Sequence, residues 1–147
     1  KQTRMPDRQS CIWFTDVRVE FVFTPKIYVA REFKQGTCMH EAILEHEYKH
    51  VDVDRDVIDK YERRMRRALR RHLRRNIVYG PVPENRLSQY QDKMVADLND
   101  VVNRYGQRME RERAREQRDV DTLEEYERIR AECDSALWRK AYDAAGM

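Results

Sequence analysis

Residues 37–75 read TCMHEAILEHEYKHVDVDRDVIDKYERRMRRALRRHLRR, and this stretch decides the fold. It contains neither Gly nor Pro, and Thr37, directly after Gly36, is a suitable N-cap residue. The pattern therefore predicts one continuous helix over 37–75. Steps of three and four residues give this helix an inward stripe, made of Ile43, Glu47, His50, Asp54, Ile58, Tyr61, Met65, Ala68 and His72.

The chain before this helix has the composition of strands. Residues 1–10 are expected to form an N-terminal tail. Residues 11–34 are rich in β-branched and aromatic side chains that alternate with polar ones, which is typical of a two-stranded antiparallel hairpin. A hairpin alone is marginally stable in water, so its apolar face is expected to pack on the helices.

Two further helices are expected after the first. Residues 76–86 hold a Gly/Pro-rich connector and predict a loop, and an amphipathic pattern follows over 87–118. Thr122, with Glu125 three residues later, fits a capping box that opens a last helix over 122–144. We therefore predict one domain of the α+β class, mainly α, covering 1–147, with a small antiparallel hairpin or sheet packed on three long helices.

The composition disfavours several classes of protein, namely all-β folds, membrane-spanning proteins and nucleic-acid-binding proteins. Of the 147 residues, 39% are charged, and only four Gly and four Pro are present, which disfavours a β-sandwich or barrel. No apolar run is long enough for a transmembrane helix. The 30 basic residues are balanced by 27 acidic ones, so the net charge of +3 gives no reason to expect nucleic acid as the main partner.

Three cysteines leave at least one thiol unpaired. If the protein is exported, Cys11 and Cys38 are the expected pair, because they flank the predicted hairpin and a bridge would clip it to the following helix. Cys133 would then be the free thiol.

Residues 46–50 read H-E-Y-K-H, the H-E-x-x-H pattern. On a helix this spacing puts the imidazoles of His46 and His50 one turn apart on the same side, where they are able to share one Zn²⁺. Glu47 lies between them and is the expected general base. The pattern thus predicts a metal-dependent hydrolase, with Zn²⁺ as its cofactor.

Polar residues interrupt the inward stripe at Glu47, His50 and Asp54. A metal explains this break, because unpaired polar groups in a core cost several kcal/mol. Asp54 lies about 12 Å along the helix from His46, too far to share its ion, so we expect Asp54 to orient His50 or a neighbouring group. The alternative is that these residues line a solvated groove or form a hydrogen-bond network with arginine.

A catalytic zinc usually has three protein ligands and an open position. With no further histidine suitably placed, the third ligand is expected to be a carboxylate from a later helix. The candidates are Glu112, Glu116, Asp119, Asp121 and Glu124.

The stretches IYVAREF, GTC, AILEHEYKHVDVDRDVI and RDVDTLEEY resemble a family of largely uncharacterised bacterial secreted or periplasmic H-E-x-x-H proteins regarded as zinc proteases. The resemblance implies a zincin-like active-site helix beside a small sheet, and a periplasmic or secreted location with a signal peptide removed. Related proteins carry an Asp-x-x-Thr-x-His segment late in the chain. Asp119 and Thr122 match it here, and Glu124 replaces the histidine, which makes Glu124 the third metal ligand that the resemblance favours.

Three functions follow as expectations. The first is a zinc peptidase acting on a protein or peptide substrate, with Tyr48, Tyr79 and Tyr126 as candidates to assist at an oxyanion. The second is a non-catalytic helical binding or scaffold protein of the cell envelope, for which charged helices also allow an oligomer. The third is a nucleic-acid or anionic-lipid surface formed by the eight arginines between Arg63 and Arg75, which the absence of aromatic residues in that tract disfavours.

Overall fold

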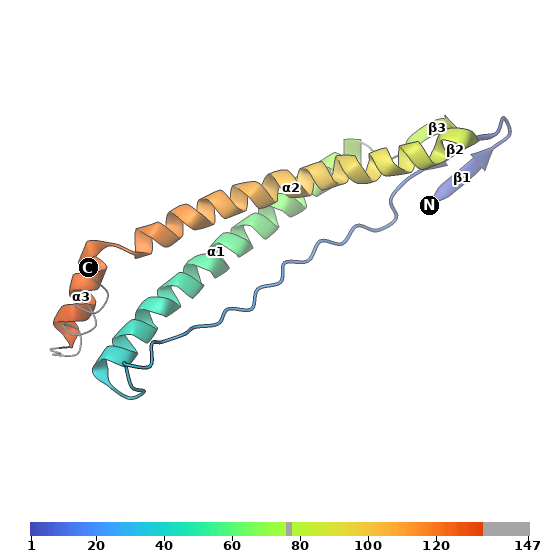
Figure 1. Ribbon diagram of the computed structural model, residues 1–147. Coiled ribbons are helices and arrows are strands. Elements are labelled where there is room, and N and C mark those ends of the chain that lie inside the picture. The colour runs from blue at the N-terminus through green and yellow to red at the C-terminus, as the bar shows by residue number, and fades with distance from the viewer. Residues whose placement is uncertain (76–77, 134–147) are drawn as a thin grey trace. The chain divides into compact units, whose positions relative to one another are not determined.

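The computed structural model describes residues 1–75 and 78–133, and its fold is α+β and mainly helical, as predicted. A three-stranded antiparallel sheet accompanies three α-helices, and a 3₁₀ turn at Glu84–Arg86 precedes the second of them (Figure 1). The strands are β1 (Gln2–Met5), β2 (Gln9–Ile12) and β3 (Tyr79–Pro83); the helices are α1 (Cys38–Arg75), α2 (Leu87–Val120) and α3 (Leu123–Glu132).

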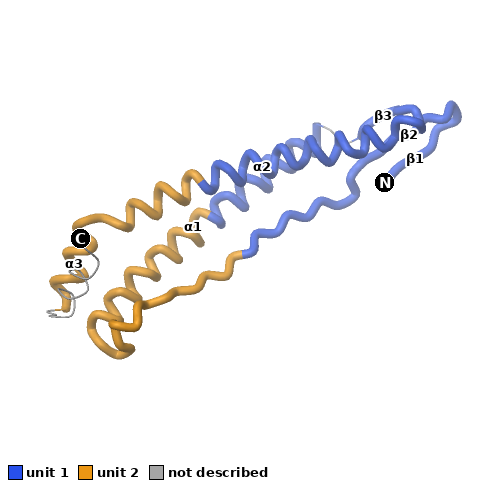
Figure 2. The backbone as a smooth tube through the Cα atoms, in the orientation of Figure 1, with its two compact units in different colours: residues 1–22, 58–110 blue, residues 23–57, 111–147 orange. Residues whose placement is uncertain are grey.

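The chain divides into two compact units, each assembled from separate stretches of sequence (Figure 2). The first unit holds residues 1–22 and 58–110, and therefore the sheet with the later part of α1 and the earlier part of α2. The second unit holds residues 23–57 and 111–147, in which α3 lies. Among the described residues, no helix has the length and apolar character needed to cross a membrane.

The helices begin where the sequence predicts. The side-chain oxygen of Thr37 accepts a hydrogen bond from the backbone N–H of His40 at 3.3 Å, which caps α1. Thr122 caps α3 in the same way, accepting from the N–H of Glu125 at 3.2 Å. Of the last predicted helix, residues 134–144 lie outside the described part of the chain.

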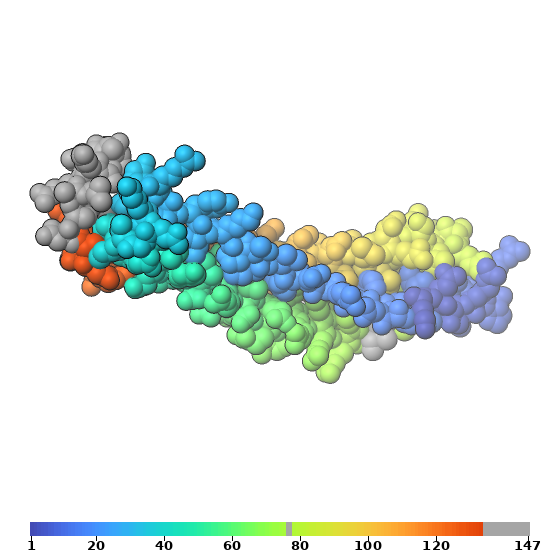
Figure 3. Space-filling view, turned by 90° about the horizontal axis from the view of Figure 1, so that it is seen from below, coloured from blue at the N-terminus to red at the C-terminus, as the bar shows by residue number. Residues whose placement is uncertain are grey.

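The predicted hairpin over 11–34 is wrong. The sheet is built from the predicted tail, the first two residues of the predicted hairpin (Cys11 and Ile12) and the predicted loop: β1 pairs with β2, and β2 pairs with β3, both antiparallel. Residues 14–29 are extended, but none of their backbone groups bonds to another backbone group in the described part of the chain. The segment lies at the surface of the molecule (blue in Figure 3).

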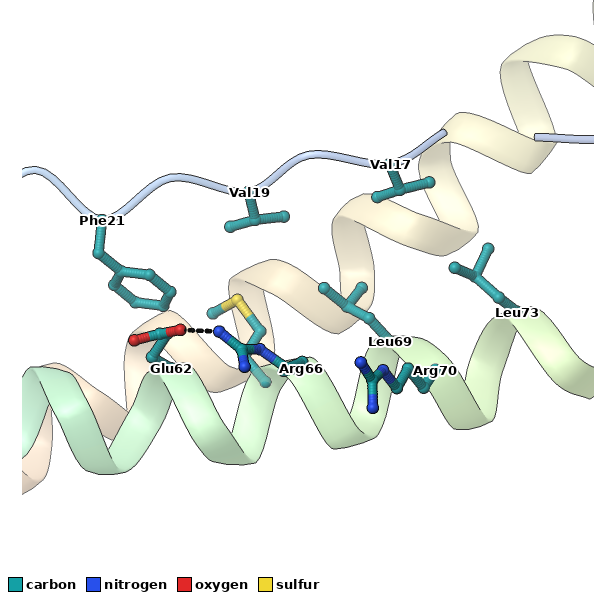
Figure 4. A pocket seen from close by; sticks show the side chains of 9 residues that line it. Val17, Val19, Phe21, Glu62, Arg66, Leu69, Arg70 and Leu73 are labelled. Atoms are coloured by element: carbon teal, nitrogen blue, oxygen red, sulfur yellow. Dashed lines mark hydrogen bonds and ion pairs between the residues drawn. The ribbon is translucent and has the colours of Figure 1, made fainter. Parts of the chain in front are cut away.

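The alternation of apolar and polar residues in this extended segment matches its burial only in part. In the first unit, Val17 and Phe21 are half-buried while Arg18 and Glu20 are exposed, but Val19 between them is also 37% exposed. Their apolar face is covered by helix side chains instead of a paired strand. Figure 4 shows the contact, a pocket of about 290 Å³ whose apolar lining residues are Val17, Val19, Phe21, Met65, Leu69 and Leu73.

Each unit has its own small core. In the first, the buried residues are Met65, Ala68, Leu69 and Val101, with Phe21, Leu98, Val102 and Tyr105 packed around them. In the second, Met39, Ala42, Ile129 and Cys133 are buried, with Phe33 and Ile43 against them. The second core joins the start of α1 to α3 and so fixes the two elements that carry the candidate site.

The disulfide joins Cys38 to Cys133, not to Cys11. Cys11 lies in β2 of the first unit and is a free thiol, whereas Cys38 and Cys133 both lie in the second unit beside its core. The expectation failed because it assumed that a hairpin over 11–34 brings Cys11 back to the start of α1.

We expect the double variant Cys38→Ser/Cys133→Ser to lose about 2–5 kcal/mol of unfolding free energy. The bridge closes a loop over a sequence separation of 95, and long loops gain most from a crosslink that restricts the unfolded chain. Urea unfolding measures the loss, and Cys11→Ser is the control, expected to change stability by under about 1 kcal/mol. Equal loss in both variants would contradict the pairing.

Gly80 in β3 is the glycine that the sheet requires. Its φ is +134°, and a Cβ added there would lie 2.7 Å from the carbonyl oxygen of Ser10 in β2. We expect Gly80→Ala to lower the unfolding free energy by about 2–3 kcal/mol.

Gly106 in α2 is the contrasting case, because a Cβ added there would have no atom within 4 Å. We expect Gly106→Ala to raise the unfolding free energy by about 0.5–1 kcal/mol. Thermal unfolding measures both variants: the melting temperature should fall in Gly80→Ala and rise in Gly106→Ala.

Candidate metal centre

His46 and His50 lie one turn apart in α1, and their side chains converge. Their Nε2 atoms are 3.1 Å apart, and the two rings meet nearly edge to face, at 85°. His46 is 5% exposed and His50 is half-buried. Because no Gly or Pro interrupts α1, a rigid backbone holds this spacing.

Asp121, between α2 and α3, completes a triangle of donor atoms. Its Oδ1 lies 3.1 Å from Nε2 of His50 and 3.3 Å from Nε2 of His46. Ligand bonds of 2.0–2.1 Å in a tetrahedron place neighbouring ligand atoms about 3.3 Å apart. The three edges of the triangle are therefore close to this spacing, and they are also hydrogen-bond distances.

Asp121 takes the position that the resemblance assigned to Glu124. Glu124 is exposed, in the first turn of α3, while the next residue, Glu125, contacts His46. Successive helical residues point about 100° apart, so both cannot face α1. Among the described residues, the other carboxylates considered as third ligand also lie outside the donor group: Glu112, Glu116 and Asp119, all on α2.

Gln117 of α2 selects the tautomer of the neutral His50 ring. Its Nε2 donates to the Asp54 carboxylate at 2.5 Å and to the backbone carbonyl of His50 at 2.9 Å. Since a carboxylate only accepts, the amide oxygen of Gln117 must be the end that faces Nδ1 of His50, and that Nδ1 must carry the proton. In the neutral ring, Nε2 of His50 is then the unprotonated nitrogen, and it lies 3.1 Å from Oδ1 of Asp121.

Asp54 is held in place by Arg113, whose guanidinium donates two hydrogen bonds to its carboxylate, at 2.6 and 2.9 Å. Burial raises the pKa of Asp54, but the hydrogen bonds from Arg113 and Gln117 outweigh burial, and the pKa lies below its ordinary value. Asp54 is thus linked to His50 through Gln117, and its role as an orienting carboxylate stays a prediction.

Glu125 faces Nδ1 of His46, as Gln117 faces Nδ1 of His50. Its carboxylate accepts from Arg128 and from Lys49, and lies 3.4 Å from Nδ1 of His46. The hydrogen bonds from Arg128, then from Lys49, hold the pKa of Glu125 at about 2. An ionised carboxylate facing Nδ1 favours the tautomer with the proton there, and leaves the Nε2 lone pair of His46 free.

Three lone-pair-bearing atoms therefore converge, from His46, His50 and Asp121. This arrangement is repulsive unless a cation, either a proton or a metal ion, lies among them. Nitrogen and carboxylate oxygen are ligands that zinc accepts in catalytic sites. Asp121 is 44% exposed, so the centre borders solvent, as an open coordination position requires.

Glu47 and His50 line a groove of about 360 Å³, whereas His46 and Asp121 are not among its lining residues. Residues 23–27, Asp54 and Gln117 also line it. Among the described residues, no hydrogen bond or ion pair engages the Glu47 side chain. Its carboxylate is half-buried and available to a water or substrate in the groove.

Of the tyrosines considered as oxyanion partners, Tyr126 lies at the centre. Its ring centroid is 5.8 Å from that of His46, and its hydroxyl donates to Asp121 at 3.4 Å. Burial, followed by the nearby Asp121 charge, raises the pKa of Tyr126, so the phenol stays protonated at neutral pH. Tyr48 is exposed, and Tyr79 bonds to Asp97 in the first unit.

Gln117 and the orienting role of Glu125 are absent from the predictions. One signal for them exists in the sequence: Gln117, Asp121 and Glu125 recur at steps of four, and all three contact the histidines of α1. A helix break falls between α2 and α3, so the spacing alone did not predict a shared face.

We expect Asp54→Asn to lower the unfolding free energy by about 1–2 kcal/mol at neutral pH, because the two charge-assisted hydrogen bonds between Arg113 and the Asp54 carboxylate are weakened. The folded pKa of Asp54 is depressed, so its ionic contribution is full above about pH 4 and is lost as pH falls through the folded pKa. Urea unfolding between pH 7 and 3 should show the wild-type and variant stabilities converging at low pH. A difference that does not depend on pH would contradict the pairing.

Comparisons with known proteins add no family to this description. No family model matches the chain, and neither a curated protein nor a solved structure matches it. The resemblance to secreted H-E-x-x-H proteins stays a prediction, and the side chains of the site carry the functional assignment.

Proposed function

We propose that this protein is a zinc-dependent metallohydrolase, and specifically a peptidase. The observation that carries the proposal is the convergence of His46 Nε2, His50 Nε2 and Asp121 Oδ1, each a lone-pair donor, with edges of 3.1–3.3 Å. The donor set and its spacing fit a catalytic zinc site with three protein ligands. Zinc bound there supplies Lewis-acid polarisation of a carbonyl group and lowers the pKa of a water molecule.

Glu47 is the general base of this proposal. It lies next to His46 in sequence, lines the groove, and has no hydrogen-bond or ion-pair partner for its side chain among the described residues. A carboxylate in this position accepts a proton from the attacking water and delivers it to the leaving amine. Tyr126 keeps its phenolic proton at neutral pH and orients Asp121 by donating to it.

The groove supports a peptide as substrate. One lining segment, residues 23–27, is extended, and its backbone groups make no hydrogen bond to other backbone groups among the described residues. An extended peptide can form main-chain hydrogen bonds with the unpaired backbone groups of such a segment, except at Pro25, which has no N–H. The half-buried Phe23 and Ile27 present apolar surface to its side chains.

We also propose that the protein is exported, to the periplasm or the medium. The Cys38–Cys133 disulfide supports this location, because disulfides persist in oxidising compartments and are rare in the cytosol.

The second candidate is a non-catalytic helical binding protein of the cell envelope. This candidate is supported by the ion pairs among the polar side chains around the histidines. Asp54 pairs with Arg113, and Glu125 pairs with Lys49 and Arg128. A hydrogen-bond network of this kind holds α3 against α1 without catalysis. The two functions differ in what zinc does to the protein.

A cleavage assay tests the proposal. The full chain with one equivalent of zinc is incubated with a mixture of unstructured peptides, and new termini are identified by mass spectrometry. We expect cleavage that 1,10-phenanthroline stops and added zinc restores. Absence of cleavage by zinc-loaded protein, together with a melting temperature that zinc and chelator leave unchanged, would favour the binding protein.

A further inference from the structure

We propose that the first unit carries a second binding site, for a phosphate-bearing ligand, in a pocket formed by the facing sides of α1 and α2. The pocket has a volume of about 240 Å³. Its lining is entirely cationic or phenolic: Tyr61, Arg64, Arg67 and Arg71 from α1, and Tyr105 and Arg108 from α2. The site is independent of the proposed zinc centre, which lies in the second unit.

Two of the four arginines that line this pocket, Arg67 and Arg71, lack an acidic partner in the part of the chain that the structure describes, residues 1–75 and 78–133. By contrast, Arg66 on another side of the same helix pairs with Glu62. Like charges at a spacing of four residues on a helix destabilise it, so an anion bound between these guanidinium groups stabilises the fold.

Two of the arginines are held by aromatic rings. The guanidinium carbon of Arg64 lies 5.2 Å from the ring centroid of Tyr61, and that of Arg108 lies 5.6 Å from that of Tyr105. Stacking of this kind uses the face of the guanidinium group and leaves its N–H groups pointing outward in the plane. The rings thus hold one arginine of α1 and one of α2 in place beside the pocket.

Phosphate is the ligand chemistry that best fits these donors. Its oxygens accept hydrogen bonds in several directions and match the forked N–H groups of arginine. The pocket volume suits a phosphate or diphosphate group. Recognition of single-stranded nucleic acid requires aromatic rings free to stack on bases, and Tyr61 is only 3% exposed, with a guanidinium already over it.

Isothermal titration of the full chain with inorganic pyrophosphate tests the site. The protein is first freed of zinc with a chelator, because pyrophosphate itself binds zinc. We expect saturable binding of one pyrophosphate per chain, weakened at least tenfold in Arg67→Gln/Arg71→Gln. The control is Arg63→Gln/Arg74→Gln, which removes the same charge from exposed positions that do not line the pocket and should leave the affinity within about twofold.

Vesicles of phosphatidylcholine with about 20 mol% phosphatidic acid, which present an anionic phosphate headgroup at their surface, identify the source of the phosphate. Vesicles that compete with pyrophosphate assign a lipid headgroup, and pyrophosphate binding without vesicle binding assigns a soluble phosphate; both support the site. If both double variants weakened pyrophosphate binding equally, the proposed site would be overturned, because that result indicates binding to a diffuse basic surface. Failure of pyrophosphate to bind would also overturn it, whatever the zinc centre does.

Discussion

Glu47→Gln is expected to remove peptide cleavage while leaving zinc bound. The amide cannot accept the proton of the attacking water, and general-base catalysis typically contributes about 10²- to 10⁴-fold to the rate. The glutamine has nearly the same shape, and Glu47 is not one of the three donor atoms. Cleavage rate and zinc content are measured on the same preparation. We expect the rate to fall by about 10²- to 10⁴-fold while the zinc content stays at one ion per chain.

The matched control for Glu47→Gln is Asp56→Asn. Asp56 is an exposed acid on the same helix and in the same unit, so the substitution removes an equal charge away from the groove. Its cleavage rate should stay within about twofold of the wild type. A Glu47→Gln variant that keeps the wild-type rate would show that another group serves as the base.

His46→Ala is expected to lower zinc affinity by more than about 100-fold. Loss of a residue that only orients a ligand typically costs about 10–100-fold in metal affinity, and His46 is a direct donor. Its orienting partner, Glu125, keeps Lys49 and Arg128 as hydrogen-bond partners, so the helices should remain folded. Competition with a chromophoric chelator measures the affinity, and circular dichroism checks the fold.

His40→Ala is the control for this second substitution. His40 lies in the first turns of α1, interacts with Glu41 at 3.3 Å, and is not part of the donor group. We expect its zinc affinity to equal that of the wild type. If both histidine variants bound zinc as tightly as the wild type, the ion would be held elsewhere.

The helices were predictable because their signals are local. Thr37 and Thr122 cap helices through hydrogen bonds to residues three positions later, and the breaker-free stretch between Cys38 and Arg75 forms a single helix. The second helix runs from Leu87 to Val120, within two residues of the predicted end. Capping and periodicity depend on neighbours in the sequence, so no tertiary knowledge is needed to find them.

The sheet was not predictable, because its strands depend on partners far apart in the sequence. β1 reads QTRM, which is exposed and mostly polar, and β3 reads YGPVP, whose Gly and two Pro are typical of a loop. Both become strands only because β2 lies between them. The stretch with the strongest strand pattern, residues 14–29, instead packs its apolar side chains on helices.

The candidate site also has a part that was predictable from local sequence and a part that was not. The spacing of His46, Glu47 and His50 within one helix fixed their relation, and Asp54 two turns beyond Glu47 could be assigned an orienting role. Asp121 was one of several carboxylates that the spacing left open. Which one approaches the histidines depends on how the chain turns between α2 and α3, and that turn is fixed by the Thr122 cap and the Cys38–Cys133 bridge.

The central claim is that His46, His50 and Asp121 hold one zinc ion. Anomalous diffraction at the zinc absorption edge, from crystals grown with one equivalent of zinc, tests it most directly. We predict one anomalous peak per chain, within about 2.0–2.2 Å of Nε2 of both histidines and of an Asp121 carboxylate oxygen. A peak at other residues, or no peak between the two histidines at full zinc loading, would contradict the account.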